Sequence, residues 1–189
     1  MKVKVSESTL ELVVGDITRQ ETEAIVNAAN NRLAPGGGVA GAIHRAAGPD
    51  LWEECKKLGG CETGQAKLTR GYRLPALCVI HTVGPVYSGS SEDAKLLESC
   101  YRESLRVAKE RGIKSVSFPA ISTGTFVYPV EEAAKIALKT ILDELRSTPS
   151  IQLVRLVLRD SDTMSVHEKA LMQDPGIHPS ISCSRPHSA

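Results

Sequence analysis

The sequence predicts an α/β protein, with a mixed or parallel sheet covered by helices. Short apolar runs typical of buried strands alternate along the chain with helical stretches of roughly 10–20 residues, which is the pattern of strand–helix–strand units. The chain has 189 residues, of which 41% are hydrophobic, so one domain with one sizeable core is expected. Ligands of such sheets bind beyond the carboxyl ends of the strands, and the loops there are the first places to search.

The first half of the chain contains two expected strands and two expected helices. Residues 9–14 form a strand-like run, and a second, short apolar run covers residues 24–27. Three glycines at 36–38 precede a helical stretch over residues 39–47, which a Gly-Pro pair ends. The stretch 50–58 is amphipathic and begins with an acidic residue, as helix N-termini favour.

The second half repeats this alternation with longer helices. In the stretch 91–111 apolar residues recur at three- and four-residue steps, from Leu97 through Tyr101 to Leu105, which predicts one buried helix face. The stretch 130–146 shows the same spacing. The other expected elements are strands at 66–69, 77–83, 115–118 and 153–158 and a last helix at 162–172.

The regular pattern ends near residue 173. Beyond it Pro, Ser and His accumulate without periodicity, so we expect one domain over residues 1–173 and a disordered tail over residues 174–189. The N-terminus runs directly into alternating, strand-like sequence and lacks the apolar run of a signal peptide. No window approaches the ~20 consecutive apolar residues of a membrane span. We therefore expect a cytoplasmic protein that contacts no membrane.

Charge and cysteine content exclude several functional classes. Lys and Arg number 23 and Asp and Glu number 22, a net charge of +1, whereas a simple electrostatic nucleic-acid binder is strongly basic. Direct nucleic-acid binding is therefore not expected. The five cysteines are irregularly spaced and form no Cys-x-x-Cys pair, which favours reduced thiols that pack as small hydrophobes over a zinc site. Neither a metal nor a cofactor is expected.

The glycine-rich segment after the strand 24–27 is the first candidate site. Asn30 follows this strand, and its amide can both donate and accept a hydrogen bond. Gly37 and Gly38 let backbone N–H groups approach an anion closely, and the N-terminus of the next helix adds partial positive charge. A plain glycine turn with an Asn-stabilised bend explains the segment about equally well.

A second loop with related chemistry follows the strand 115–118. From Ser122 to Thr125 it offers hydroxyls, backbone amides and a glycine, which suit another phosphate cradle. Phe126 beside them either packs on a sugar or belongs to the core. Two such loops at the ends of different strands fit a diphosphate between them better than either fits a turn.

Asp16, directly after the strand 9–14, is the third candidate. Its carboxylate can accept a hydrogen bond from the exocyclic amine of a base, or it can cap the following turn. Capping is the more common role of an aspartate in this position.

Motifs of other nucleotide-binding and hydrolytic families are absent from the sequence. There is no GxxxxGK[ST], the glycines lack the G-x-G-x-x-G spacing, and there is no G-x-S-x-G. His44 and His81 have no Cys or Asp at a spacing typical of a catalytic dyad, and His81 is interpreted as a core histidine. P-loop, nicotinamide-binding and serine-hydrolase chemistry are therefore not expected.

Six segments together resemble those of the macrodomain family, in the right order and over roughly residues 3–171. They are Gly15-Asp16-Ile17-Thr18, Ala24-Ile25-Val26-Asn27-Ala28-Ala29-Asn30, Gly36-Gly37-Gly38-Val39, His44-Arg45-Ala46-Ala47-Gly48, His81-Thr82-Val83-Gly84-Pro85 and Pro119-Ala120-Ile121-Ser122-Thr123-Gly124. Residues 43–48 and Cys61-Glu62-Thr63-Gly64 most resemble the MacroD-type branch. That branch removes ADP-ribose from acidic side chains and deacetylates O-acetyl-ADP-ribose.

The resemblance implies a three-layer α/β/α fold with a mixed, mostly parallel six-stranded sheet, and ADP-ribose or an ADP-ribosylated protein as the partner. It further implies that Asp16 holds the adenine amine and that Ile17 makes a backbone contact beside it. Asn30 would position the distal ribose, and it is the one residue to which the resemblance gives a catalytic role. The two loops would cradle the diphosphate. The implied ligand-binding residues are Asp16, Ile17, Asn30, Gly37, Gly38, Val39, Ser122, Thr123, Gly124, Thr125 and Phe126.

Three positions depart from the MacroD-type pattern. Ala40 stands where that branch has an Asp credited with positioning or activating water. Val127 stands where a Gly usually follows the aromatic residue of the phosphate loop, so a shifted or stiffer loop is expected. Arg159 stands where an aromatic residue often covers the adenine, although a guanidinium can also stack on a base.

Three functions therefore remain open. Binding of ADP-ribose and terminal ADP-ribosyl groups needs only the cleft, and every cleft segment is present. Hydrolysis of ADP-ribosyl esters or O-acetyl-ADP-ribose would need water held by the substrate's own phosphate, since loss of a strong general base typically costs 10²–10⁴-fold. RNA binding or RNase regulation is the third, and the balanced charge and 4% aromatic content argue against it.

Overall fold

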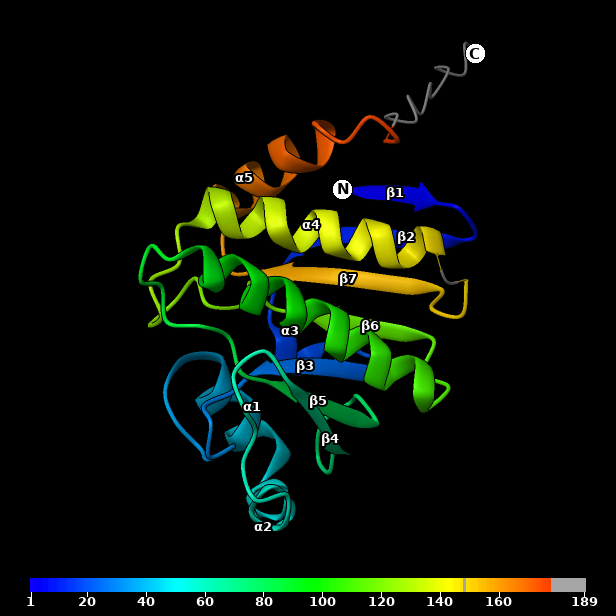
Figure 1. Cartoon of the computed structure of the whole chain (residues 1–189). Coiled ribbons are helices and arrows are strands. Elements are labelled where there is room, and N and C mark those ends of the chain that lie inside the picture. Colours follow the sequence, from blue (N-terminus) through cyan, green and yellow to red (C-terminus); the bar gives the residue numbers. More distant parts are fainter. Residues whose placement is uncertain (148, 178–189) are drawn as a thin grey trace, which may run out of the picture.

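The computed structural model describes residues 1–147 and 149–177. Its strands are β1 (Lys2–Val5), β2 (Ser8–Val14), β3 (Ala24–Ala28), β4 (Ala66–Arg70), β5 (Cys78–Thr82), β6 (Ser115–Phe118) and β7 (Leu153–Leu158). Its helices are α1 (Gly38–Ala47), α2 (Pro49–Lys57), α3 (Ser91–Glu110), α4 (Val130–Ser147) and α5 (Ser161–Met172), with the short 3-10 helix η1 (Ile17–Arg19) (Figure 1).

The described strands form one mixed sheet in the order β1-β2-β7-β6-β3-β5-β4. The five inner strands are parallel to one another, and only β1 and β4 pair antiparallel to their neighbours at the two edges. The predicted mixed, mostly parallel sheet is confirmed. It has seven strands rather than the six that the resemblance implied, because Lys2–Val5 alternates exposed and buried residues and pairs with β2.

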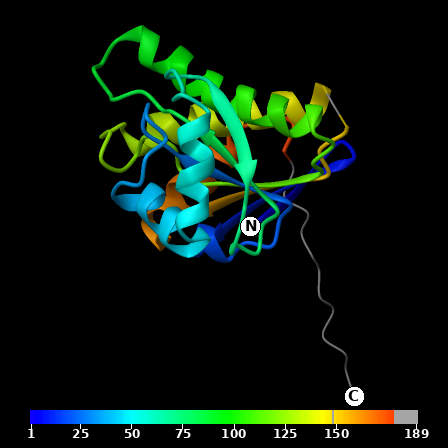
Figure 2. The same ribbon diagram turned by 90° about the horizontal axis from the view of Figure 1, so that it is seen from below.

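Helices pack on the two faces of this sheet and form a separate apolar core on each. Successive strand residues point to opposite faces, so Ala24 and Val26 of β3 belong to one core while Ile25 between them belongs to the other. The larger core contains residues of α3, α4 and α5, and the smaller one contains residues of α1 and α2. Figures 1 and 2 show α3 and α4 together on one side of the sheet.

The packed part of the chain extends slightly beyond the predicted domain end at residue 173. The Ile177 side chain is buried in the larger core, and Asp174 accepts two hydrogen bonds from the Arg146 guanidinium. Residues 178–189, the rest of the expected tail, lie outside the described residues. None of the helices in the described ranges is long and apolar enough to cross a membrane.

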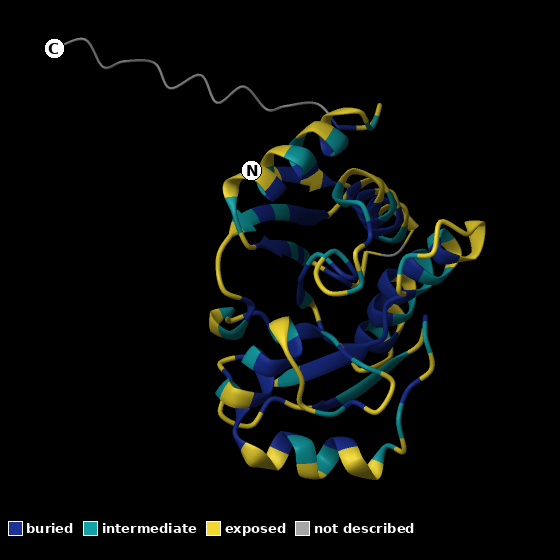
Figure 3. Ribbon diagram, turned by 90° about the vertical axis from the view of Figure 1, so that its left-hand side faces the viewer, coloured by how far each residue is buried: buried dark blue, intermediate teal, exposed yellow. Residues whose placement is uncertain are grey.

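The parallel strands place several loops at one edge of the sheet. The carboxyl ends of β2, β7, β6, β3 and β5 all lie at this edge, since the strands run in the same direction. Figure 3 shows the central strands as buried, whereas many loop residues around them are exposed. The loops that the sequence singled out therefore converge on one place.

Candidate functional site

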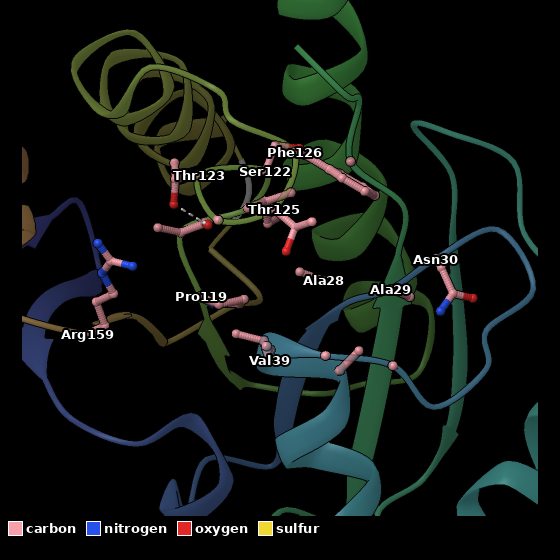
Figure 4. A pocket seen from close by; sticks show the side chains of 18 of the residues that line it. Ala28, Ala29, Asn30, Val39, Pro119, Ser122, Thr123, Thr125, Phe126 and Arg159 are labelled. Atoms are coloured by element: carbon pink, nitrogen blue, oxygen red, sulfur yellow. Dashed lines mark hydrogen bonds between the residues drawn. The ribbon is translucent and has the colours of Figure 1, made fainter.

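A cavity of about 390 Å³ lies at the carboxyl ends of the strands (Figure 4). Its walls come from the ends of β3, β5, β6 and β7, from the start of α1, and from the loop between β6 and α4. The lining residues are Ala28, Ala29, Asn30, Gly36, Gly37, Gly38, Val39, Ala40, Gly84, Pro119, Ala120, Ile121, Ser122, Thr123, Gly124, Thr125, Phe126, Val130, Val157, Arg159 and Thr163. Nine of the eleven predicted ligand-binding residues are thus brought together in one hollow.

One wall is the glycine loop, residues 36–39, which leads into α1. Gly37 is the N-cap of α1 and makes no side-chain capping bond, so the first backbone N–H groups of the helix remain available to a ligand. Only Gly38 has a left-handed backbone, with a φ of 56°. Amides of a helix N-terminus attract anions through hydrogen bonding and the helix dipole. This wall can therefore bind a phosphate without any charged side chain.

The facing wall is the hydroxyl loop, residues 122–126, and Val127, which follows it, does not line the cavity. Ser122 and Val127, neither of them glycine, both have left-handed backbones, with φ values of 65° and 53°. The loop is closed by its own bonds, because Val127 N donates to Gly124 O at 2.9 Å and Tyr128 N donates to Ser122 O at 3.0 Å. The Thr123 hydroxyl donates to Ala120 O at 2.9 Å. The loop therefore holds its shape without a ligand.

Ser122 anchors the hydroxyl loop to the neighbouring strand end. Its side chain is buried, and its hydroxyl oxygen has no hydrogen-bond partner among the described residues. It lies directly against Gly84, where any side-chain carbon would overlap the Ser122 hydroxyl. Glycine at position 84 thus permits the close contact between the loop after β5 and the hydroxyl loop.

Asn30 lines the cavity and also closes the loop that follows β3. Its Oδ1 accepts a hydrogen bond from Ala34 N at 3.0 Å, and its Nδ2 donates to Ala34 O at 2.9 Å. Each atom keeps further bonding capacity, since an amide oxygen has two lone pairs and the nitrogen carries two hydrogens. Asn30 can therefore hold the loop and a ligand hydroxyl at the same time.

Asp16 and Ile17 lie outside the cavity lining. The Asp16 carboxylate caps η1, because one oxygen accepts from Thr18 N at 2.8 Å and from the Thr18 hydroxyl at 2.7 Å. These bonds hold the pKa of Asp16 below its usual range, and the other oxygen lies 3.8 Å from the Arg19 Nε. Ile17 is buried in the smaller core. Capping leaves one carboxylate oxygen free for a second acceptor role.

Arg159 is the only ionisable side chain among the residues that line the cavity. It lies on the opposite side of the cavity from Asn30 (Figure 4). Its side chain is 80% exposed, and its Nε donates to Asp160 Oδ2 at 2.8 Å. Ala40 is buried beside the glycine loop and has no group that could act as a base. The cavity therefore contains no carboxylate or imidazole that could activate water.

Three histidines are buried in the described part of the chain, His44, His81 and His167, and none of them lines the cavity. The Asn27 amide donates to Nδ1 of His81 at 3.1 Å, and Nε2 of His81 contacts the Thr69 hydroxyl at 2.9 Å. Burial lowers the pKa of His81 to about 3, with His44 adding to the effect. The interpretation of His81 as a core histidine is confirmed. Burial also lowers the pKa of His44, whose two ring nitrogens have no hydrogen-bond partner among the described residues.

Several cavity residues were not identified from the sequence. Val157 and Pro119 lie at the carboxyl ends of β7 and β6, where the strand-end rule could have found them. Gly84 belongs to one of the segments that resemble the macrodomain family, but it is not among the predicted ligand-binding residues, and its close contact with Ser122 has no sequence signal. Thr163 belongs to α5, a helix that follows the last strand, and only the tertiary fold brings it to the cavity.

The described residues contain no cluster of three or more His, Cys, Asp or Glu side chains that could hold a metal ion. The four cysteines in the described ranges are free thiols. The cavity is lined by backbone amides, hydroxyls and apolar groups together with the Asn30 amide and the Arg159 guanidinium, a chemistry suited to binding a polar ligand with an anionic centre.

Comparison with known proteins gives a consistent result. The model of the Macro domain family matches residues 26–137. A macro domain-containing protein of Chlorobaculum tepidum is 52% identical over 163 residues, which are 86% of this chain and 95% of that protein. An ADP-ribose glycohydrolase of Xenopus laevis, MACROD2, is 56% identical over 134 residues, which are 70% of this chain but 32% of that protein.

Solved structures agree with the sequence comparisons. A macrodomain of Oceanobacillus iheyensis with ADP has a TM-score of 0.88 and 43% identity, and the match covers 91% of this chain and 94% of that one. A macrodomain of Trypanosoma brucei in complex with ADP-ribose has a TM-score of 0.82 and 40% identity, covering 86% of this chain and 68% of that one.

Proposed function

The chain belongs to the Macro domain family, and we propose that it binds ADP-ribose and terminal ADP-ribosyl groups in the cavity at the strand ends. The observation that carries this proposal is the pair of facing walls. The glycine loop offers free helix-terminal amides, and the hydroxyl loop offers amides and hydroxyls across from them. A diphosphate between these walls would place one sugar at Asn30 and the adenosine toward Arg159 and Asp16.

Calorimetric titration with ADP-ribose and with AMP tests this placement. ADP-ribose should bind more tightly, because AMP lacks the second phosphate and the distal ribose that would reach Asn30. Equal affinities would refute the placement. The same titration in EDTA should give an unchanged affinity, since the proposed site uses no metal.

Asp16→Ala should weaken ADP-ribose binding, because the free carboxylate oxygen would accept a hydrogen bond from the adenine amine. Such a bond to a charged group is worth about 1.5–3 kcal/mol, so a roughly 10- to 150-fold loss is expected. Titration of the variant measures it. Asp16→Asn serves as the control that separates the two roles, because its single amide oxygen can still cap η1 while its NH2 group, in place of the second oxygen, cannot accept from the amine. A variant that binds as tightly as the parent would leave Asp16 with the capping role alone.

Hydrolysis is the second candidate function, favoured by the likeness to a relative described as an ADP-ribose glycohydrolase. The substrates would be ADP-ribose esters of acidic side chains on proteins, and O-acetyl-ADP-ribose. Because the lining contains no carboxylate or imidazole, a phosphate oxygen of the substrate would have to hold the attacking water. Asn30 would orient the distal ribose, and slow turnover is expected without a general base.

Ala40→Asp should raise the rate of this hydrolysis without improving affinity. The new carboxylate would lie in the first turn of α1, where a negative charge is tolerated, and it would orient water near the distal ribose. A gain of about one to three decades fits such a role. Repulsion from the diphosphate should leave affinity unchanged or slightly lower. Product release from O-acetyl-ADP-ribose and from a glutamate-ADP-ribosylated protein measures the effect.

Asn30→Ala, combined with Ala40→Asp, is the control for this experiment. It should remove most of the gain, because the ribose would lose its positioning group. Two outcomes contradict the idea: no rate increase while ADP-ribose still binds, or a parent that already hydrolyses as fast as the Asp variant. The second outcome would favour the substrate-held water.

The expected partner is therefore an ADP-ribosylated protein or a free ADP-ribose derivative. A cytoplasmic location accords with the free thiols of the described cysteines, because reducing compartments keep thiols unpaired.

A further inference from the structure

Two exposed valines lie beside the cavity and take no part in the proposed binding of ADP-ribose. Val86 is 61% exposed and Val127 is 65% exposed. Tyr87 N donates a hydrogen bond to Phe126 O at 2.9 Å, so the loop after β5 and the hydroxyl loop lie side by side at this point. Val86 and Val127 adjoin that bond, and we call them the apolar rim. Since Phe126 itself lines the cavity, the rim borders its opening.

The backbone of Val127 is unfavourable for a valine. Its φ of 53° lies in the left-handed region, which side chains branched at Cβ rarely adopt. The neighbouring loop bond from Val127 N to Gly124 O holds it there. The isopropyl group gains little from packing, because most of it is exposed. A strained residue that contributes neither burial nor a bond of its side chain indicates a role outside the fold.

The rim lies at the end of the cavity where an attached group would leave. Asn30 and Phe126 are on the same side of the cavity, whereas Arg159 is on the other (Figure 4). In the proposed function, on which this inference rests, Asn30 positions the distal ribose. That sugar carries the bond to the modified protein. The polypeptide attached to it would therefore pass Phe126 and meet the rim.

We propose that the apolar rim contacts the polypeptide that carries the ADP-ribosyl group and favours an apolar side chain next to the modified residue. Both rim side chains are uncharged and branched, so they offer contact area to another aliphatic group and no hydrogen bond to a polar one. Removing part of two valine side chains from water gives about a tenfold gain in affinity. Free ADP-ribose does not reach the rim and gains nothing from it.

The test uses two peptides that carry ADP-ribose through a hydrolysis-resistant linkage. In one peptide the modified residue is flanked by Leu and Val, and in the other by Ser and Thr. Affinities for both peptides and for free ADP-ribose are measured by calorimetry for the parent and for the double variant Val86→Ser, Val127→Asn. Asparagine adopts the left-handed backbone readily, so the loop should keep its shape. Leu77→Ser is the matched control, because Leu77 is 71% exposed and precedes β5, whereas Val86 follows it.

The parent should bind the apolar-flanked peptide about tenfold more tightly than the polar-flanked one. The double variant should bind the two peptides equally, with free ADP-ribose unchanged, and Leu77→Ser should behave like the parent. Equal binding of both peptides by the parent overturns the inference, as does a preference that survives in the double variant or is lost in Leu77→Ser. If the parent binds no ADP-ribose at all, the proposed function itself fails, and this result is separate from a lack of peptide preference.

Discussion

The two walls of the cavity offer similar groups to a ligand but obtain their shapes by different means. The glycine loop has glycine at its left-handed position, Gly38, and presents the open N-terminus of α1. The hydroxyl loop places Ser122, and Val127 directly after it, in left-handed backbone, where glycine would be unstrained. The glycine loop therefore follows from local residue preferences, whereas the hydroxyl loop is imposed by its surroundings.

The surroundings of the hydroxyl loop are rigid enough to impose that shape. Ile121 N donates to the hydroxyl of buried Tyr101 at 3.3 Å, which ties the start of the loop to α3. Tyr128 at its end is buried and packs against Tyr87, with ring centroids 4.8 Å apart. Ser122 lies against Gly84 between these anchors. The difference teaches that the shape of the glycine loop can be altered by substituting its own residues. The shape of the hydroxyl loop can be altered only by substituting the residues that anchor it.

Gly41→Ala should give the largest loss of stability and affinity, because the new side chain would push against the backbone of the glycine loop. A methyl group on Gly41 would overlap the backbone carbonyl oxygen of Gly36, which cannot rotate away. Overpacking of this kind costs about 1–3 kcal/mol of stability. Displaced amides should also lower ADP-ribose affinity roughly 10- to 150-fold. Urea unfolding and calorimetry measure the two effects.

Gly37→Ala is the control for that substitution. A methyl group there meets open space, and Gly37 has an ordinary φ of −87°, so stability should change by less than about 0.5 kcal/mol. An equal loss of stability in Gly37→Ala and Gly41→Ala would contradict the view that Gly41 supports the loop.

Acid should loosen the glycine-loop side before the hydroxyl-loop side. Two of the three buried histidines of the described residues lie on the glycine-loop side, His44 on α1 and His81 near it. The third, His167, lies on α5, which packs against α4, and burial lowers its pKa as well. Burial lowers the pKa of His44 and His81 below the usual value near 6.5. The unfolded chain therefore binds more protons below that pH, and stability falls as pH decreases. For His81 alone, with a pKa of about 3, the loss at pH 5 is roughly 2 kcal/mol.

Denaturant unfolding at pH 7 and pH 5 measures this loss, and amide hydrogen exchange locates it. Exchange should accelerate in α1 more than in α4. Equal stability at the two pH values would contradict the burial of neutral histidines in the fold, and faster exchange appearing first in α4 would contradict the greater acid sensitivity of the side that holds His44 and His81.

Val127→Gly should have the smallest effect, and it should stabilise. Glycine relieves left-handed strain of roughly 1–2 kcal/mol but adds about 0.4–1 kcal/mol of freedom to the unfolded chain. A net gain of about 0.5–1 kcal/mol is expected in thermal or urea unfolding. Val86→Gly is the comparison, since Val86 is equally exposed but has no left-handed backbone to relieve. A loss of stability in both variants would mean that Val127 is unstrained.

The architecture and most of the cavity followed from sequence patterns, because both depend on local periodicity and on strand ends. Asn30, the glycine loop and residues 122–126 could be placed together since each follows a parallel strand. The remaining features depend on contacts between distant segments. The contact of Gly84 with Ser122 and the arrival of Thr163 from α5 arise from packing that no single stretch encodes.

Ala40 and Val127, the two departures from the MacroD-type pattern in these loops, also differ in how far their effects follow from the sequence. Ala40 is visible in the sequence as a missing carboxylate, and its consequence for water activation follows directly. The expectation that Val127 shifts or stiffens the loop stays a prediction, and the structure shows a left-handed backbone at that residue. The anchors at Tyr101 and Tyr128 account for this, and only the folded chain reveals them.

A cavity that meets an anion with main-chain amides has an evolutionary consequence. Point mutations replace side chains but leave backbone amides in place. Binding of the two phosphates would therefore persist as long as the loops keep their backbone conformation. Arg159 at one end of the cavity and the apolar rim beside Phe126 act through their side chains, which are free to vary. Lineages could thus exchange preferences for what is attached to the ligand while inheriting the central hold unchanged.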